Sequence, residues 1–212
     1  KAFSILFLYL LIGCAHVEES LVINPGEQPT TDSLEAGLWM QIEKIEEATK
    51  TSGRLVTDEK LNSYVKNIVC NLAGEYCSDI RVYILNVNMF NASMYPNGMM
   101  HIYTGLLLRT QNESQLASIL GHEITHYIKR HSLKRFVDLQ NTADFLAVFS
   151  AALYSVGAGP TANLATLIAR GSIAAYSRDH EREADSGGLD LLVKDGYSPA
   201  GAPEIWEYIT KE

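Results

Sequence analysis

The segment LASILGHEITHYIKRH, residues 116–131, sets two histidines and a glutamate at fixed spacing within an amphipathic pattern. Asn112 and Gln115 resemble a capping box, so we predict that a helix opens there. Its apolar stripe is Leu116, Ile119, Leu120, Ile124 and Ile128. A helix turns once in about 3.6 residues, so His122 and His126 point from one face and both imidazoles can reach one metal ion.

Glu123 lies about 100° round this helix from His122, which places its carboxylate beside the metal rather than on it. A carboxylate in that position can take a proton from a water molecule at the metal, as a general base does. An H-E-x-x-H pattern arises by chance in roughly one sequence of this composition in eighty. A zinc site of this kind also needs a third protein ligand, which should lie downstream.

Candidates for the third ligand lie in YSRDHEREADSGGLDLL, residues 176–192. Glu181 and Asp185 are four residues apart on a predicted helix and share a face. Glu181 can complete a set of two histidines and one glutamate around zinc. Asp185 can accept a hydrogen bond from the far nitrogen of a ligating histidine and so fix its tautomer. Glu183 is interpreted as a solvated surface residue.

Three further histidines compete as ligands. His180 adjoins Glu181 and faces about 100° away from it, so we interpret it as pocket lining or surface. His131 follows a basic run at the end of the predicted helix, where a cation suits the helix dipole. His101 lies in a predicted strand, and we expect it in the cleft rather than on the metal.

Helices surround one small group of strands in the predicted pattern, which indicates an α+β fold. The other predicted elements are helices over 34–48, 58–72, 142–156 and 163–194, a strand over 81–87, and a Pro-Asn-Gly turn with a strand over 94–105. The net charge is -8, and the only dense basic run is short, so a nucleic-acid partner is excluded.

The first thirteen residues are strongly apolar after Lys1. They are too few to span a bilayer, which takes about 20 residues, but suit a signal peptide; the alternative is a buried helix. Because the sequence begins with Lys, we expect part of the signal to precede it. The polar residues 14–33 are predicted to form a tether, and residues 34–212 to form the folded domain.

LIGC, residues 11–14, resembles the lipobox of bacterial lipoproteins, in which cleavage before the cysteine is coupled to its lipidation. The resemblance implies a membrane anchor at Cys14 on the periplasmic side of a bacterial envelope, and Ala15 favours the outer membrane. Export places Cys70 and Cys77 in an oxidising compartment, where they form either a disulfide or two free buried thiols.

Three blocks together resemble the M48 family of zinc metallopeptidases, the bacterial lipoprotein and periplasmic proteases related to the Ste24 and HtpX membrane enzymes. They are FNASMYPNGMMHIYTGLL (90–107), LASILGHEITHYIKRH (116–131) and YSRDHEREAD (176–185). The resemblance implies a mostly helical zincin-type domain whose small sheet lines the cleft with its edge strand. It also implies one zinc ion per chain on His122, His126 and Glu181, with Glu123 as general base and Asp185 as a neighbouring carboxylate, also regarded as a proton donor.

Other parts of the family pattern extend the resemblance. Asn91 and Ala92 match its Asn-Ala pair, and the strand around Ile102 resembles the edge strand to which extended substrates pair. Its Pro-Gly-Gly turn is Pro-Asn-Gly here, and Asn97 is expected to tolerate a left-handed backbone. The family's His-Pro-containing segment and following Arg would come after Glu212, so we expect the C-terminal part to be trimmed.

The function implied is an endopeptidase that degrades misfolded or unassembled envelope proteins, with unfolded or extended polypeptides as substrates and envelope assembly machinery as a candidate partner. One alternative is a chaperone-like lipoprotein that holds unfolded clients with little proteolysis. Another is a metallohydrolase with a non-peptide substrate. Arg178 is expected either to orient the site carboxylates or to form a surface ion pair.

Overall fold

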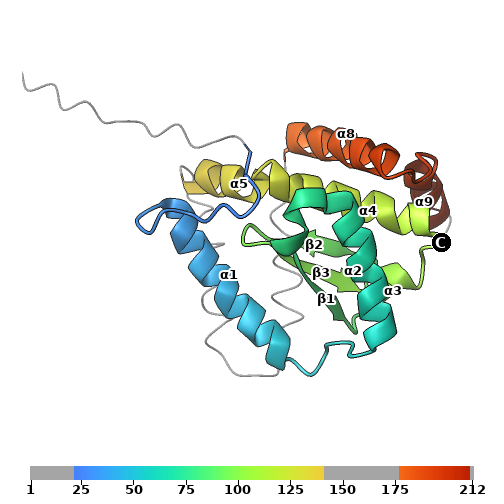
Figure 1. Cartoon of the computed structure of the whole chain (residues 1–212), viewed down its shortest axis with the longest axis horizontal. Coiled ribbons are helices and arrows are strands. Elements are labelled where there is room, and N and C mark those ends of the chain that lie inside the picture. The colour runs from blue at the N-terminus through green and yellow to red at the C-terminus, as the bar shows by residue number, and fades with distance from the viewer. Residues whose placement is uncertain (1–21, 141–176, 211–212) are drawn as a thin grey trace, which may run out of the picture.

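The computed structural model describes residues 22–140 and 177–210 and has the predicted α+β fold (Figure 1). In chain order its elements are α1 (Leu34–Thr51), α2 (Glu59–Ala73), the 3-10 helix η1 (Gly74–Ser78), β1 (Arg81–Leu85), β2 (Ala92–Met94), β3 (Met99–Tyr103), α3 (Thr104–Leu107), α4 (Glu113–Ile128), α5 (His131–Gln140), α8 (Arg178–Lys194) and α9 (Gly201–Ile209). The signal segment with Cys14, the predicted helix over 142–156 and residues 163–176 lie outside the described residues.

Side-chain caps fix where the main helices begin. The Asn112 side chain accepts a hydrogen bond from the Gln115 N–H, as the capping pattern predicts, and α4 follows. Ser177 has an extended backbone and caps α8 by accepting from the His180 N–H. The prediction of one unbroken helix over 163–194 is therefore wrong at Ser177, because its backbone is extended and α8 begins only at Arg178.

The sheet has the strand order β1-β3-β2, with β3 parallel to β1 and antiparallel to β2. The strand around Ile102 is therefore the central strand, and the prediction that it is the edge strand is wrong. The edge beside α4 belongs to β2, whose three residues are too few to show a strand period in the sequence.

The turn between β2 and β3 is the predicted Pro-Asn-Gly turn, and its left-handed residue is the glycine. Gly98 has the left-handed backbone (φ 85°), while Asn97 does not. The Asn97 side chain instead accepts from the Met99 N–H and donates to Glu46 of α1. Asn97 therefore does not need the left-handed backbone that we expect it to tolerate, because Gly98 takes that conformation without a Cβ penalty.

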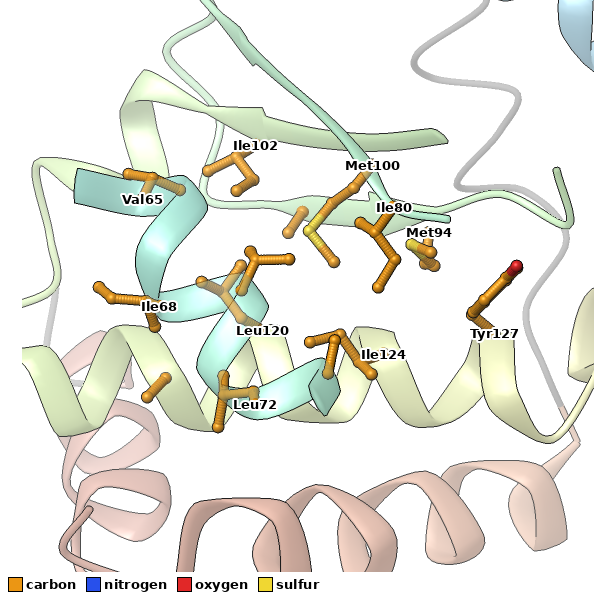
Figure 2. Close-up of a cluster of buried hydrophobic side chains, with 14 of the residues drawn as sticks. Val65, Ile68, Leu72, Ile80, Met94, Met100, Ile102, Leu120, Ile124 and Tyr127 are labelled. Carbon is orange, nitrogen blue, oxygen red and sulfur yellow. The ribbon is translucent and has the colours of Figure 1, made fainter. Parts of the chain in front are cut away.

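Helix α4 lies at the centre of the molecule, with α2 and the sheet on one side and α8 along the other (Figure 1). The core forms between α4, α2 and one face of the sheet (Figure 2). Val65, Ile68 and Leu72 of α2 meet Leu120 and Ile124 of α4 there. This packing fixes the helix that carries the H-E-x-x-H pattern.

The described residues before α1, 22–33, are held against the domain. Ile23 is 1% exposed, its N–H donates to the Ile128 carbonyl, and its own carbonyl accepts from Tyr76. The predicted tether is thus corrected from Ile23 onward, because an apolar residue in that polar stretch reaches the core.

Cys70 and Cys77 form a disulfide that ties α2 to η1, so the bridge rather than two thiols is present. Within residues 22–140 and 177–210, no helix combines the length and apolarity needed to cross a membrane.

Candidate metal centre

The close approach of α4 and α8 brings the two site segments together. A Cβ on Gly188 would lie 2.7 Å from the backbone nitrogen of His122, and one on Gly121 would lie 3.0 Å from the Gly188 carbonyl oxygen. Side chains at these positions would push the helices apart. The glycines therefore let the acidic residues of α8 reach the histidines of α4.

His122, His126 and Glu181 form the cluster that the sequence predicts. One ligand atom from each lies within 4.8 Å of the others. The two histidine Nε2 atoms are 3.0 Å apart, and Glu181 oxygens lie 3.5 Å from His122 Nε2 and 3.9 Å from His126 Nε2. Tetrahedral zinc with Zn–N near 2.0–2.1 Å separates two nitrogens by about 3.3 Å, so this donor set fits zinc.

Burial keeps His126 neutral. The side chain is 2% exposed, and burial, helped by the rings of His122, His131 and His180, lowers its pKa to about 2. A neutral imidazole has a free lone pair for a metal ion. His126 is therefore ready to act as a ligand at neutral pH.

Glu123 lies beside the cluster and is held by the edge strand. Its Oε2 accepts a hydrogen bond of 3.0 Å from the Met94 N–H at the end of β2. Burial raises the pKa of Glu123 to about 8, the Met94 N–H opposes this, and the Glu181 charge adds to it. A carboxyl group held beside the cluster in this way can accept a proton from a water molecule there, as a general base does.

Asp185 contacts the far side of His122, as predicted. Its Oδ1 lies 2.9 Å from His122 Nδ1, which leaves His122 Nε2 facing His126 and Glu181. A carboxylate at Nδ1 fixes the proton on that nitrogen and the lone pair on the other. All five predicted site residues thus lie in or next to the cluster of His122, His126 and Glu181.

Several neighbouring residues differ from their predicted positions. His101 is fully buried, and its Nε2 lies 3.1 Å from Thr49 Oγ1 of α1, so it is not a cleft residue. Burial lowers the pKa of His101 to about 4, although the Glu46 charge opposes this. Side chains alternate along β3, and the face away from α4 takes His101.

His131 and Glu183 are also corrected. His131 begins α5 rather than ending α4, and it is fully buried. Its Nε2 lies 3.0 Å from Glu183 Oε2, and Lys129 Nζ lies 3.1 Å from the other Glu183 oxygen. Glu183 is thus paired with two side chains, although its own side chain is still 41% exposed. The His180 ring stacks on His131 with centroids 4.5 Å apart, while Arg178 is exposed at the first residue of α8.

A cleft of about 630 Å³ opens beside the cluster. His122, Glu123, Glu181 and Asp185 supply its polar side. Its apolar wall includes Phe90, Leu106, Ile119, Leu189 and Trp206. Asn91 and Ala92 of the matched Asn-Ala pair also line it. The cleft therefore joins the cluster to the edge strand and to a large apolar surface.

Sequence reasoning missed the glycines of α8 and the residues of α9. The Gly-Gly pair inside a predicted helix was a signal, because glycine in a helix interior is unfavourable unless another backbone comes close. Trp206 gave no comparable signal, since it reaches the cleft only through the packing of α9 on α4.

The chain is similar to known proteases over much of its length. Residues 56–211 match the sequence model of peptidase family M48. The beta-barrel assembly-enhancing protease of Escherichia coli is 28% identical over 165 residues, covering 74% of this chain and 34% of that protein. The protein of the same name in Yersinia pestis is 27% identical over 173 residues, covering 77% and 35%.

A plant protein is also similar to this chain. The mitochondrial metalloendopeptidase OMA1 of Arabidopsis thaliana is 32% identical over 130 residues, covering 61% of this chain and 26% of that protein. The chain spans a quarter to a third of the length of these curated relatives.

Proposed function

The chain belongs to peptidase family M48, as its motifs indicate, and from this premise we propose that it is a zinc-dependent endopeptidase that degrades misfolded or unassembled envelope proteins. The observation that carries the proposal is the convergence of His122, His126 and Glu181 within 4.8 Å, with Glu123 in the same cleft. This set supplies a metal site and a separate proton acceptor, which are the two parts that metal-assisted hydrolysis needs.

Each residue has a distinct chemical role. A zinc ion on His122, His126 and Glu181 would supply Lewis-acid chemistry to the peptide carbonyl and to water. Glu123 accepts the proton of the attacking water and then delivers it to the leaving amine. The Met94 N–H keeps the Glu123 carboxylate at the edge of the sheet, where the substrate backbone would lie.

The open side of β2 supports an extended polypeptide as substrate. In the described residues β2 pairs only with β3, and the β2 residue Ala92 lines the cleft. An extended chain can add to such an edge through main-chain hydrogen bonds, which require little of the side-chain sequence. Unfolded segments meet this requirement and folded proteins do not.

The apolar wall supports the same substrate class. Phe90 and Trp206 contact each other edge to face with ring centroids 6.2 Å apart, and both line the cleft. Misfolded and unassembled proteins expose apolar side chains that native proteins bury. A site beside such a wall would favour these chains.

The location proposed is the periplasmic side of a bacterial envelope, with a lipid anchor at Cys14, in the outer membrane rather than the inner. The lipobox pattern supports the anchor. Two relatives are named for enhancing beta-barrel assembly, so envelope assembly machinery is the partner we propose.

A chaperone-like role is the alternative, because the apolar cleft would also hold unfolded clients. The position of Glu123 favours the enzyme, since a binding surface gains nothing from a half-buried carboxyl group next to a metal site.

Metal analysis and a casein-cleavage assay on the purified chain test the proposal. We expect one zinc per chain, cleavage that a chelator abolishes, and recovery when zinc is restored. Casein cleavage that persists in the metal-free protein would contradict the proposal, and so would a zinc-loaded protein that binds casein without cutting it.

A further inference from the structure

His131 lies directly behind the metal-ligand candidate His126. Its Nδ1 is 2.8 Å from His126 Nδ1, and the two ring centroids are 4.9 Å apart. On the other side of the ring, its Nε2 lies 3.0 Å from Glu183 Oε2. The three side chains form a line that starts at the cluster and ends on α8.

A break in the helix is what turns His131 toward His126. On an uninterrupted helix, a residue five positions later points about 140° away. Here α4 ends at Ile128, Arg130 adopts a left-handed backbone (φ 53°), and α5 starts at His131. Among the described residues Arg130 is the only non-glycine with positive φ.

The left-handed residue is held in place by ion pairs. Arg130 is 8% exposed, and its guanidinium binds Glu27 at 3.0 Å and also Glu35. A side chain with a Cβ disfavours this conformation, and such residues persist where the surrounding structure holds them. The surroundings of Arg130 thus maintain the bend that places the His131 ring.

The hydrogen-bonding geometry determines which ring nitrogens of His126 and His131 carry a proton. His126 Nε2 faces His122 and Glu181, so a metal ion there would leave the ring proton on His126 Nδ1. His131 Nδ1 must then accept that proton's hydrogen bond. Its own proton is consequently on Nε2 and is donated to Glu183, which Lys129 also contacts.

We propose that His131 and Glu183 are positioning residues for the metal centre, which fix the orientation and tautomer of His126. The inference rests on the proposed zinc site. It gives each histidine ligand a carboxylate partner, Asp185 directly on His122 and Glu183 through His131 on His126. Partners of this kind raise ligand basicity, and their loss typically weakens metal binding by about 10–100-fold.

The two carboxylate partners differ in how well water can replace them, because their hydrogen bonds are buried to different extents. The Asp185 side chain is 72% exposed, so water can replace part of its hydrogen bond to His122. His131 is 0% exposed, so water cannot reach His126 Nδ1 through it. Removing the acceptor on His131 should therefore affect metal binding more than neutralising Glu183, which is 41% exposed.

Zinc affinity of the full chain, measured by competition with a chromophoric chelator, tests the proposal. His131→Leu keeps the bulk and removes the acceptor, and we expect zinc binding about 10–100-fold weaker. His131→Asn places an amide oxygen where Nδ1 accepts, and we expect it to recover most of the loss. Glu183→Gln should have a smaller effect, and Asp190→Asn, an exposed acid on the same helix, should match the wild type.

A spectroscopic readout separates positioning from packing. In the zinc-loaded wild type with 15N-labelled histidine, the His126 Nδ1–H proton should appear far downfield because it is held between two rings. In His131→Leu that resonance should move upfield or be lost. Its absence from the wild type would overturn the proposal even if the leucine variant did not fold.

Two affinity results would also overturn the inference alone: unchanged binding in His131→Leu, or equal losses in His131→Leu and His131→Asn, which would indicate packing. Failure of the wild type to bind zinc would instead remove the proposed metal site, and this inference with it.

Discussion

Gly188 of α8 lies so close to His122 of α4 that a Cβ on the glycine would be 2.7 Å from the His122 nitrogen. This contact sets the distance between the histidine ligands and the acidic residues of α8. The metal centre thus depends on backbone packing as well as on its ligands.

Gly188→Ala should therefore destabilise the protein and weaken metal binding. The methyl group would meet backbone, which cannot move aside cheaply, so we expect a loss of about 1–3 kcal/mol in the free energy of unfolding. Gly37→Ala is the matched control, because Gly37 is an exposed residue of α1 with no atom within 4 Å of an added Cβ. That variant should be neutral or slightly stabilised. Equal denaturation midpoints for the two variants would contradict the claim that the contact between α4 and α8 requires glycine at position 188.

Glu181→Ala should lose zinc far more readily than a matched surface variant. Removing a ligand should cost more than the roughly 100-fold upper range for loss of an outer partner. Asp179→Ala is the control, since Asp179 lies in the same first turn of α8 and its side chain is 84% exposed. Zinc content after dialysis against a weak chelator measures both. Glu183→Ala should fall between them, and full zinc retention in Glu181→Ala would mean that another carboxylate is the ligand.

The apolar wall should set the preference for substrate side chains. Trp206→Ala should lower kcat/KM by about tenfold for peptides with Phe or Leu near the cleaved bond, because a large apolar contact is lost. Peptides with Ser in the same place should change little. Leu108→Ala, which removes an exposed apolar side chain outside the cleft, is the control. Equal losses for the Phe and Ser peptides would argue against an apolar subsite.

Glu46 should make the stability of the protein depend on acid pH. Burial opposes its ionisation, but hydrogen bonds from Arg81 and Tyr83 and the Arg81 charge outweigh this and lower the pKa of Glu46 from 4.5 to about 2. Because the folded pKa is the lower one, the stabilisation is present above pH 4.5 and is lost as the pH falls toward 2.

Between neutral pH and pH 3 this loss amounts to about 2 kcal/mol. Glu46→Gln removes the titrating group. Between neutral pH and pH 3, the free energy of unfolding of this variant should therefore fall by about 2 kcal/mol less than that of the wild type. Urea titrations of both proteins with a chelator present measure the difference without a contribution from metal release. Parallel pH profiles would contradict the assignment.

Local geometry explains which parts of the site were predictable. His122, Glu123 and His126 lie within one and a half turns of a helix, so their relative directions follow from spacing alone. The Glu181 and Asp185 pair is predictable for the same reason. The start of α4 is predictable from its capping residue Asn112, whereas the cap of α8 at Ser177 is not part of the prediction.

The misassigned residues depend on contacts between distant segments. The position of β2 at the sheet edge depends on pairing with β3, and no feature of three residues reveals it. The sequence predicts His131 at a helix end, because it does not reveal the bend at Arg130, which is held by Glu27 and Glu35 from a distant segment. Glu183 looked like surface because its partner histidine comes from another helix.

Cleavage of casein by Glu123→Gln, with zinc content measured on the same sample, is the most direct test of the account. The glutamine keeps an oxygen that can accept from the Met94 N–H, so the fold and the three ligands should be preserved. We predict zinc near one per chain together with loss of cleavage. Wild-type cleavage by a zinc-loaded Glu123→Gln protein would contradict it.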